Sequence, residues 1–150
     1  MLKIKTVTIH SYRGETGKTS IIINLAEYLA SMGKKICLVD FDLRSPSLLS
    51  HFSVRPRCYI NDFLEERCRD INDVLVDIDG FSDNLCLAFA SSDIKDIKES
   101  MMTDRIHQIR ILNRLLNGRD SLKDKMDYLL LDTVQELDIL QQMRSSSQIL

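Results

Sequence analysis

The 150-residue chain lacks the features that define several classes of protein. No run of about 18 or more apolar residues occurs, which argues against an ordinary membrane-spanning helix. The N-terminal residues contain no cleavage-site pattern, so the sequence predicts a cytoplasmic chain rather than a secreted one. The net charge of -2 and the isoelectric point near 5.9 give no overall basic character. Contact with nucleic acid would therefore need a local basic patch.

The four cysteines lack the C-x-x-C spacing of common metal and redox motifs. Cys37 and Cys86 lie in strand-like runs, and Cys58 and Cys68 lie between these runs. The sequence predicts buried free thiols, and an iron–sulfur site shared between subunits is an alternative that the spacing does not support. Repeats and Gly/Ser-rich linkers are absent too, and 44% hydrophobic residues suffice for the core of one domain.

The most informative segment that is present is R-G-E-T-G-K-T at residues 13–19, between two apolar runs. A loop of small residues can turn its backbone N–H groups inward, and a helix that begins at Lys18 directs its positive end at the same point. Lys18 would reach the β- and γ-phosphates of a nucleotide, and the Thr19 hydroxyl would hold a bridging Mg²⁺. The segment therefore predicts binding of a nucleoside triphosphate.

Hydrophobic periodicity predicts alternating strands and helices. Residues 2–10 alternate in the manner of a strand, and apolar residues then recur at three- and four-residue steps from Lys18 until Gly33. Residues 35–40 form a short apolar run that is typical of a strand buried on both faces. Strand, helix and strand in this order predict a βαβ unit, and hence an α/β fold with a mostly parallel sheet.

The rest of the chain is less regular. Further strands are expected at residues 84–90 and 127–132. Helical segments are expected at residues 47–52, 59–66, 70–77, 94–116 (with a break near Thr103) and 137–143. The sequence ends at residues 148–150, where another strand would begin. This predicts that residues 1–150 form a single P-loop ATPase domain, either its N-terminal part or an unusually short version.

Three aspartates follow the predicted buried strands. Asp40 and Asp42 end the second strand, and Asp132 ends the fourth. The carboxyl ends of parallel strands share one edge of the sheet, which is where such sheets bind ligands. One of these carboxylates could hold the water shell of Mg²⁺, and another could orient an attacking water.

The order and spacing of these motifs are similar to those of the ParA/MinD ATPases, the P-loop family with a deviant Walker A loop. That loop reads K-G-G-x-G-K-T, with Arg13 here in place of the signature lysine and Glu15 in place of the second glycine. The runs N-L-A at 24–26, G-K-K at 33–35 and L-V-D-F-D at 38–42 match as well. Residues 42–48 resemble the first switch of the family, and residues 127–133 resemble its second acidic motif.

The resemblance implies a SIMIBI-like P-loop fold and a slow ATPase that dimerises with ATP and positions DNA, division machinery or other cargo. A homodimer and an unidentified regulator or cargo protein are the implied partners, whereas DNA and membrane contact cannot be read from the sequence. The implied catalytic residues are Lys18, Asp42 and Arg13, with Arg13 reaching the phosphates of the partner subunit. Mg²⁺ would be held by Thr19, Asp40 and Asp132, and ATP by Arg13, Gly14, Glu15, Thr16, Gly17, Lys18, Thr19 and Ser20.

Two departures from the family pattern leave alternatives open. Glu15 would repel a triphosphate unless its side chain points away, as the similar G-E-S-G-K-S loop of heterotrimeric G-protein α subunits allows. V-Q-E at residues 134–136 replaces a switch that usually contains proline and glycine, which leaves the hydrolysis rate and partner coupling open. A non-hydrolysing nucleotide-binding interaction module is therefore the alternative function, and a tyrosine autokinase of related fold is less favoured.

Overall fold

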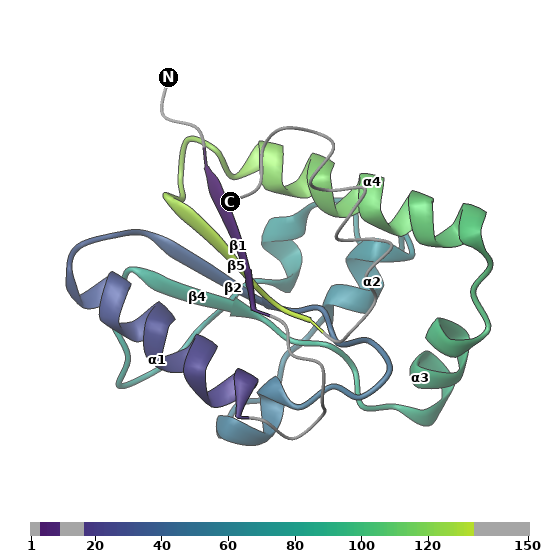
Figure 1. The fold of residues 1–150 in the computed structure, drawn as a ribbon, viewed down its shortest axis with the longest axis horizontal. Helices are drawn as coiled ribbons and strands as arrows, with labels where there is room; N and C mark the ends of the chain where they lie inside the picture. The colour runs from purple at the N-terminus through teal and green to yellow at the C-terminus, as the bar shows by residue number, and fades with distance from the viewer. Residues whose placement is uncertain (1–3, 10–16, 134–150) are drawn as a thin grey trace.

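A five-stranded β-sheet forms the centre of the molecule, with helices on both of its faces (Figure 1). This computed structural model describes residues 4–9 and 17–133. The strands follow the order β1-β5-β2-β4-β3, and every pair is parallel except the antiparallel pair β3–β4 at one edge. Their bounds are Lys5–Ile9 for β1, Ile36–Asp40 for β2, Val76–Asp77 for β3, Leu85–Ala88 for β4 and Tyr128–Asp132 for β5. The predicted mostly parallel sheet is confirmed.

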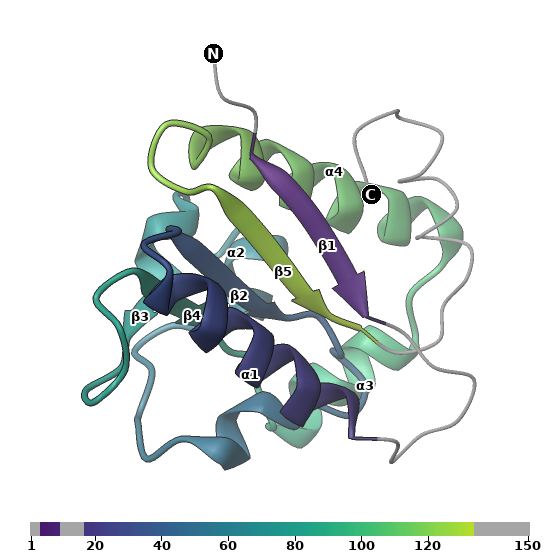
Figure 2. The ribbon, with the colours of Figure 1, turned by 60° about the vertical axis from the view of Figure 1, so that its left-hand side comes forward.

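The sheet separates the core into two layers, one under α1 and the other under α2 and α4. Figure 2 shows α1 in front of the sheet and α4 behind it. α1 (Lys18–Ser31) buries one residue every four, so that Ile22, Ala26 and Ala30 pack on one face of the sheet. α2 (Ile60–Leu64) and α4 (Arg105–Ser121) pack on the opposite face. α3 (Ile94–Met101) and two short 3-10 helices, η1 (Leu48–His51) and η2 (Ile71–Val74), complete the described elements.

Capping residues explain where several helices begin. The Asp93 carboxylate accepts a hydrogen bond from the Lys95 N–H at 2.8 Å and starts α3. The Asp104 carboxylate does the same for the His107 N–H at 2.8 Å and starts α4. Two helices therefore replace the single long one, and the expected break near Thr103 is confirmed.

The prediction of helix through residues 70–77 is wrong in its second half. η2 makes only one turn, and Leu75 then turns to an extended conformation with φ at -80° and ψ at 135°. The next two residues form β3, in which Val76 pairs with Leu87 of β4. A strand of two residues shows no periodicity of its own, so only its pairing with β4 defines it. The helix predicted at residues 137–143 lies outside the described residues.

All four cysteines are free thiols. Cys37 and Cys86 are buried and lie opposite each other in β2 and β4, whereas Cys58 and Cys68 are partly exposed. The predicted burial therefore holds for the strand pair and not for the other two. Within residues 4–9 and 17–133, we find no helix with the length and apolar character needed to cross a membrane.

Candidate functional site

The N-terminus of α1 lies at the carboxyl edge of the sheet. Gly17 precedes the helix with φ at 79°, a left-handed conformation that glycine adopts more readily than other residues. Lys18 then begins the helix, and its Nζ donates a hydrogen bond to the carbonyl of Thr133 at 3.1 Å. The first turn of a helix carries N–H groups without intrahelical partners, and these attract anions. The positive end of α1 and the Lys18 ammonium are thus directed at one edge.

Only part of the predicted phosphate loop belongs to the described residues. The expected ligands Arg13, Gly14, Glu15 and Thr16 fall within residues 10–16 and lie outside the description. Ser20 is exposed, and its carbonyl accepts a hydrogen bond from the Asn24 side chain, as expected within a regular helix surface. The roles predicted for these loop residues stay predictions, and so does the direction of the Glu15 side chain.

The Thr19 hydroxyl connects three segments that are far apart in the sequence. Its Oγ1 donates a hydrogen bond of 2.7 Å to Oδ2 of Asp132 at the end of β5. The same oxygen lies 3.0 Å from Oγ of Ser47, which precedes η1. The hydroxyl and the carboxylate that were predicted to share a metal ion are therefore in direct contact.

Asp40 lies beside Asp132 on the same face of the sheet. The two are register partners in the adjacent parallel strands β2 and β5. Side chains alternate along a strand, so both carboxylates continue the row of Leu38 and Leu130, which packs under α1. Both are buried, with 0% and 3% of their surface exposed. Two carboxylates are thus held in an apolar layer next to the first turn of α1.

The Asp40 carboxylate also holds both ends of the loop of residues 41–47, here termed the Asp42 loop. Its Oδ1 accepts from the Asp42 N–H and its Oδ2 from the Leu48 N–H, both at 3.1 Å. Burial raises the pKa of Asp40 to about 7, and the charges of Asp132 and Asp42 add to this, although the two N–H bonds oppose it. Asp40 therefore fixes both ends of the Asp42 loop, and its charge changes at about pH 7.

Asp42 faces the same cluster from the loop. Its Oδ1 accepts a hydrogen bond from the Ser45 N–H at 2.9 Å. Burial raises the pKa of Asp42, the charge of Asp132 raises it further, and the charge of Lys18 lowers it. These influences require that Asp42 lies within electrostatic range of both groups. The structure therefore brings the predicted residues Lys18, Thr19, Asp40, Asp42 and Asp132 to one edge.

Sequence reasoning assigned no role to Ser47 or to the Thr133 carbonyl. Ser47 belongs to the switch-like run at residues 42–48, and a hydroxyl in that run was the only signal for it. The Thr133 carbonyl is a backbone group and leaves no signal in the sequence. Both contacts depend on how the loops fold over the sheet edge.

The donor set of this edge fits Mg²⁺ when a nucleotide supplies further ligands. Hydroxyl and carboxylate oxygens are hard donors, and Mg²⁺ is commonly held by one or two protein groups together with phosphates and water. In the part of the chain that the structure describes, no group of three His, Cys, Asp or Glu side chains could hold a metal ion alone. Thr19 and Asp132 thus suit a Mg²⁺ ion whose remaining ligands come from the phosphates of a bound nucleotide and from water.

The pH dependence of stability tests the buried state of Asp40. Between about pH 4 and pH 7 the folded chain keeps a proton at Asp40 that the unfolded chain has released, given the raised pKa. The contribution of Asp40 to the free energy of unfolding should therefore fall as the pH rises, by at most about 1.4 kcal/mol per pH unit.

Urea unfolding of the nucleotide-free protein at a series of pH values measures this slope. Asp40→Asn should flatten the slope of stability against pH between about pH 4 and 7. It should also lower stability by a constant amount at every pH, because the single amide oxygen can replace only one of the two carboxylate oxygens that accept N–H bonds. Parallel curves for wild type and Asp40→Asn would contradict the raised pKa.

The chain is similar to several known proteins. Residues 4–149 match the family model of the AAA domain. The chromosome-partitioning ATPase Soj of Treponema pallidum is 30% identical over 136 residues, which cover 91% of this chain and 51% of that protein. Among solved structures, the cell division ATPase MinD of Pyrococcus furiosus aligns with a TM-score of 0.71 and 26% identity, covering 94% of this chain and 55% of that one.

The septum site-determining protein MinD of Pyrococcus horikoshii, in complex with Mg-ADP, aligns with a TM-score of 0.69 and 25% identity. That alignment covers 97% of this chain and 54% of the MinD chain. A ParA family protein of Chlamydia muridarum is 26% identical over 136 residues, which cover 89% of this chain and 51% of that protein. This chain spans about half the length of these curated relatives.

Proposed function

The chain belongs to the ParA/MinD-type P-loop ATPases, and on that basis we propose that it binds ATP with Mg²⁺ and hydrolyses it slowly. ATP binding would favour a homodimer, and hydrolysis would reverse it. The two states would differ in affinity for a regulator or for a cargo such as DNA or division machinery. The names of the relatives, chromosome-partitioning ATPase and cell division ATPase, support this class of cargo.

One observation carries the proposal: the hydrogen bond between Thr19 and Asp132 at the N-terminus of α1. It joins the hydroxyl of the P-loop segment to the acid that ends β5, although the two are 113 residues apart in the sequence. A metal-binding hydroxyl and a supporting carboxylate need this proximity. Lys18 is directed to the same edge, where its Nζ donates to the Thr133 carbonyl and places a positive charge beside this pair.

Each residue then has a proposed task. Lys18 would neutralise the β- and γ-phosphates, and Thr19 would hold Mg²⁺ with Asp132 and Asp40 supporting it. The bound Mg²⁺ would neutralise charge that develops between these phosphates during hydrolysis. Asp42 would orient the attacking water. Phosphate contacts are proposed for the backbone of residues 13–20, with Arg13 reaching the partner subunit.

The Asp42 loop gives the proposed switch a physical basis. Its last residue, Ser47, shares the Thr19 hydroxyl with Asp132. A metal ion bound at that hydroxyl would add a ligand to an oxygen that already donates its proton to Asp132, and would change the geometry of the Ser47 contact. The loop is also held at both ends by Asp40. A change at Thr19 would therefore reach Ser47 directly, and Ser47 belongs to the same loop as Asp42.

Asp42→Asn should separate binding from turnover. The amide keeps the size of the side chain and removes the charge that orients water, so ATP turnover should fall by about 100-fold with little change in ATP affinity. The ATP-bound dimer should then persist, and mass measured by light scattering should rise with ATP in both wild type and Asp42→Asn.

The outcomes distinguish the candidate functions. Tight ATP binding by wild type without any turnover would select the non-hydrolysing interaction module. If wild type neither binds ATP nor changes mass with it, the proposal is lost. Asp83→Asn, which neutralises an acid outside the site, is the matched control and should behave as wild type.

A further inference from the structure

Large apolar side chains are exposed mainly on one part of the surface. Among the described residues, eight such side chains are exposed, and five of them belong to α3, the following turn and the first turns of α4. Met102 is 86% exposed and Ile106 is 78% exposed. Clustered exposure of this kind marks interaction sites more often than scattered single residues do. We term this set the α3–α4 surface, and it consists of Ile94, Met101, Met102, Ile106 and Ile109.

Helical spacing places these side chains on outward faces. In α3, Ile94, Lys98 and Met101 follow each other at four- and three-residue steps and share one face. The opposite side of α3 is anchored, because Ser100 Oγ donates a hydrogen bond to the Leu43 carbonyl at 2.9 Å. In α4, Ile106 and Ile109 lie three residues apart, away from the buried residues of the helix. The apolar side chains are thus exposed by the packing of the helices, not by a loosely attached end.

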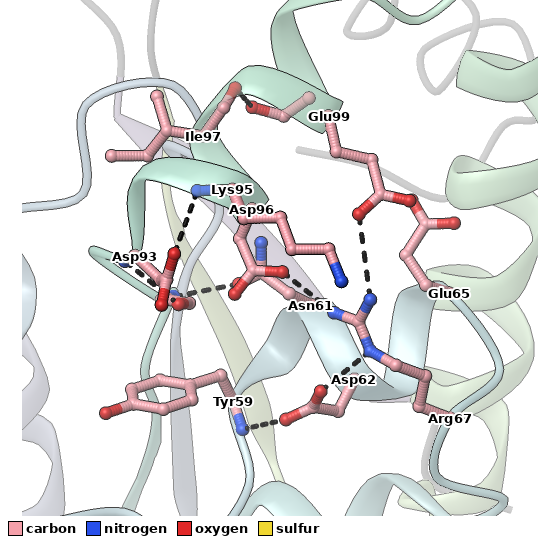
Figure 3. A network of polar contacts seen from close by, with 12 residues as sticks. Tyr59, Asn61, Asp62, Glu65, Arg67, Asp93, Lys95, Asp96, Ile97 and Glu99 are labelled. Atoms are coloured by element: carbon pink, nitrogen blue, oxygen red, sulfur yellow. Dashed lines mark hydrogen bonds and ion pairs between the residues drawn. The ribbon is translucent and has the colours of Figure 1, made fainter.

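Four of the acids near this surface contact basic or histidine side chains of the protein itself. Figure 3 shows Asp96 and Glu99 of α3 turned towards Arg67, with nitrogen–oxygen distances of 3.1 and 3.6 Å. The same Arg67 pairs with Asp62 at 2.9 Å. Glu65 pairs with His107 at 2.8 Å. Asp62, Asp96 and Glu99 therefore contact Arg67, and Glu65 contacts His107, rather than the exposed apolar side chains.

The nearby cations are left facing solvent. Lys95, Lys98 and Arg105 are exposed, and within residues 4–9 and 17–133 none of them has an acidic partner within salt-bridge distance. An apolar strip bordered by unpaired cations is complementary to a ligand that combines apolar and acidic groups. The exposed methionines suit a helical ligand, since their flexible side chains adapt to its apolar face.

We infer that the α3–α4 surface binds an acidic amphipathic helix of a partner protein. The apolar face of that helix covers Met101, Met102 and Ile106, and its acids meet Lys98 and Arg105. The exposed carboxylates of Asp93 and Asp104 border the same surface, so the acids of the partner helix must lie at Lys98 and Arg105 rather than along its whole length. An anionic membrane carries charge over its whole area and would meet these carboxylates as well, which makes it a poorer fit.

This site is separate from the proposed nucleotide site but is connected to it. The Ser100 contact reaches Leu43, the residue next to Asp42. A partner on α3 would therefore lie against an element that restrains the Asp42 loop. Docking itself needs no nucleotide, so its test can be made without ATP and can fail independently of the proposed function.

Peptide binding by fluorescence anisotropy tests the inference. Three labelled peptides of about 15 residues, or four helical turns, are compared on the full chain without nucleotide. The first is an amphipathic helix with leucines on one face and glutamates on the other, the second replaces glutamate by lysine, and the third is an acidic scramble without an apolar face. The first should bind at least about tenfold more tightly than either of the others.

Two sets of variants locate the binding. Met102→Glu with Ile106→Glu should weaken the acidic amphipathic peptide by about tenfold or more, whereas the control Met32→Glu, at an exposed position after α1, should not. Lys98→Glu with Arg105→Glu should reverse the preference towards the lysine peptide. Both sets change exposed residues, and circular dichroism checks that the fold is kept.

Several results would overturn the inference. Equal binding of the three peptides, or binding that survives Met102→Glu with Ile106→Glu, excludes this surface. Binding to phosphatidylserine vesicles but not to the acidic peptide would assign it to a membrane. A concentration-dependent mass that the same pair of substitutions abolishes would assign it to a second copy of the chain.

Discussion

Replacing Lys18 with alanine is expected to lower ATP turnover by at least about 100-fold and to weaken ATP binding severely. The ammonium group is the cation that the described structure directs at the edge where Thr19 and Asp132 meet. Without it, the negative charge of the triphosphate would face the carboxyl groups of Asp40, Asp42 and Asp132 without the positive charge of Lys18. Phosphate release and the fluorescence of a labelled ATP analogue measure the two losses.

The control for Lys18 must remove a lysine without touching the site. Lys123 is exposed and follows α4, so Lys123→Ala should leave turnover and binding unchanged. Lys18→Arg should not restore wild-type turnover, because the planar guanidinium cannot replace a compact ammonium in a close phosphate site. Normal turnover in Lys18→Ala would remove the basis for a P-loop in this chain.

Replacing Gly118 with valine is expected to destabilise the fold by about 2–3 kcal/mol or more. Gly118 is buried in α4, where a Cβ would lie 2.8 Å from two ring atoms of Phe63 and 2.9 Å from Cδ1 of Ile71. Atoms at such distances overlap, so the buried side chains of Phe63 and Ile71, or the helices that carry them, must shift. Glycine within a helix costs about 1 kcal/mol relative to alanine, and here the close approach of the helices explains its presence. Urea unfolding measures the loss.

A second substitution shows whether steric overlap is the cause. Phe63→Leu shortens the side chain that the new Cβ would meet, so Gly118→Ala should be less destabilising in that background than in wild type. Asn117→Ala, on the exposed side of the same helix, should change stability by less than about 0.5 kcal/mol. A small effect of Gly118→Val together with additive double variants would contradict the close packing of α4.

Much of the site could be predicted because it depends on rules of local sequence and topology. The run from Gly17 to Thr19 shows where a helix begins, and apolar runs before Asp40 and Asp132 show where buried strands end. Parallel strands place such ends at one edge of the sheet. The break between α3 and α4 was also predictable, since Asp104 is a helix-capping residue.

Other features depended on contacts between distant segments. β3 is defined by its pairing with β4, because two residues carry no periodicity. The Ser47 hydroxyl lies 3.0 Å from Thr19, at the end of a loop that Asp40 holds at both ends. The outward direction of Lys98 and the inward direction of Asp96 both follow from how α3 packs beside Arg67.

By itself, the sequence determined the family, the order of the strands and helices along the chain apart from β3, and the kinds of side chain that can meet a phosphate and a metal ion. These follow from short-range patterns, in which each residue type limits the backbone and the chemistry near it. The tertiary structure alone decided that Asp40 is buried beside Asp132, that Ser47 shares the Thr19 hydroxyl, and that the acids of α3 turn inward while its apolar residues face solvent. Burial and partner choice depend on atoms that are distant in sequence, and folding brings those atoms together.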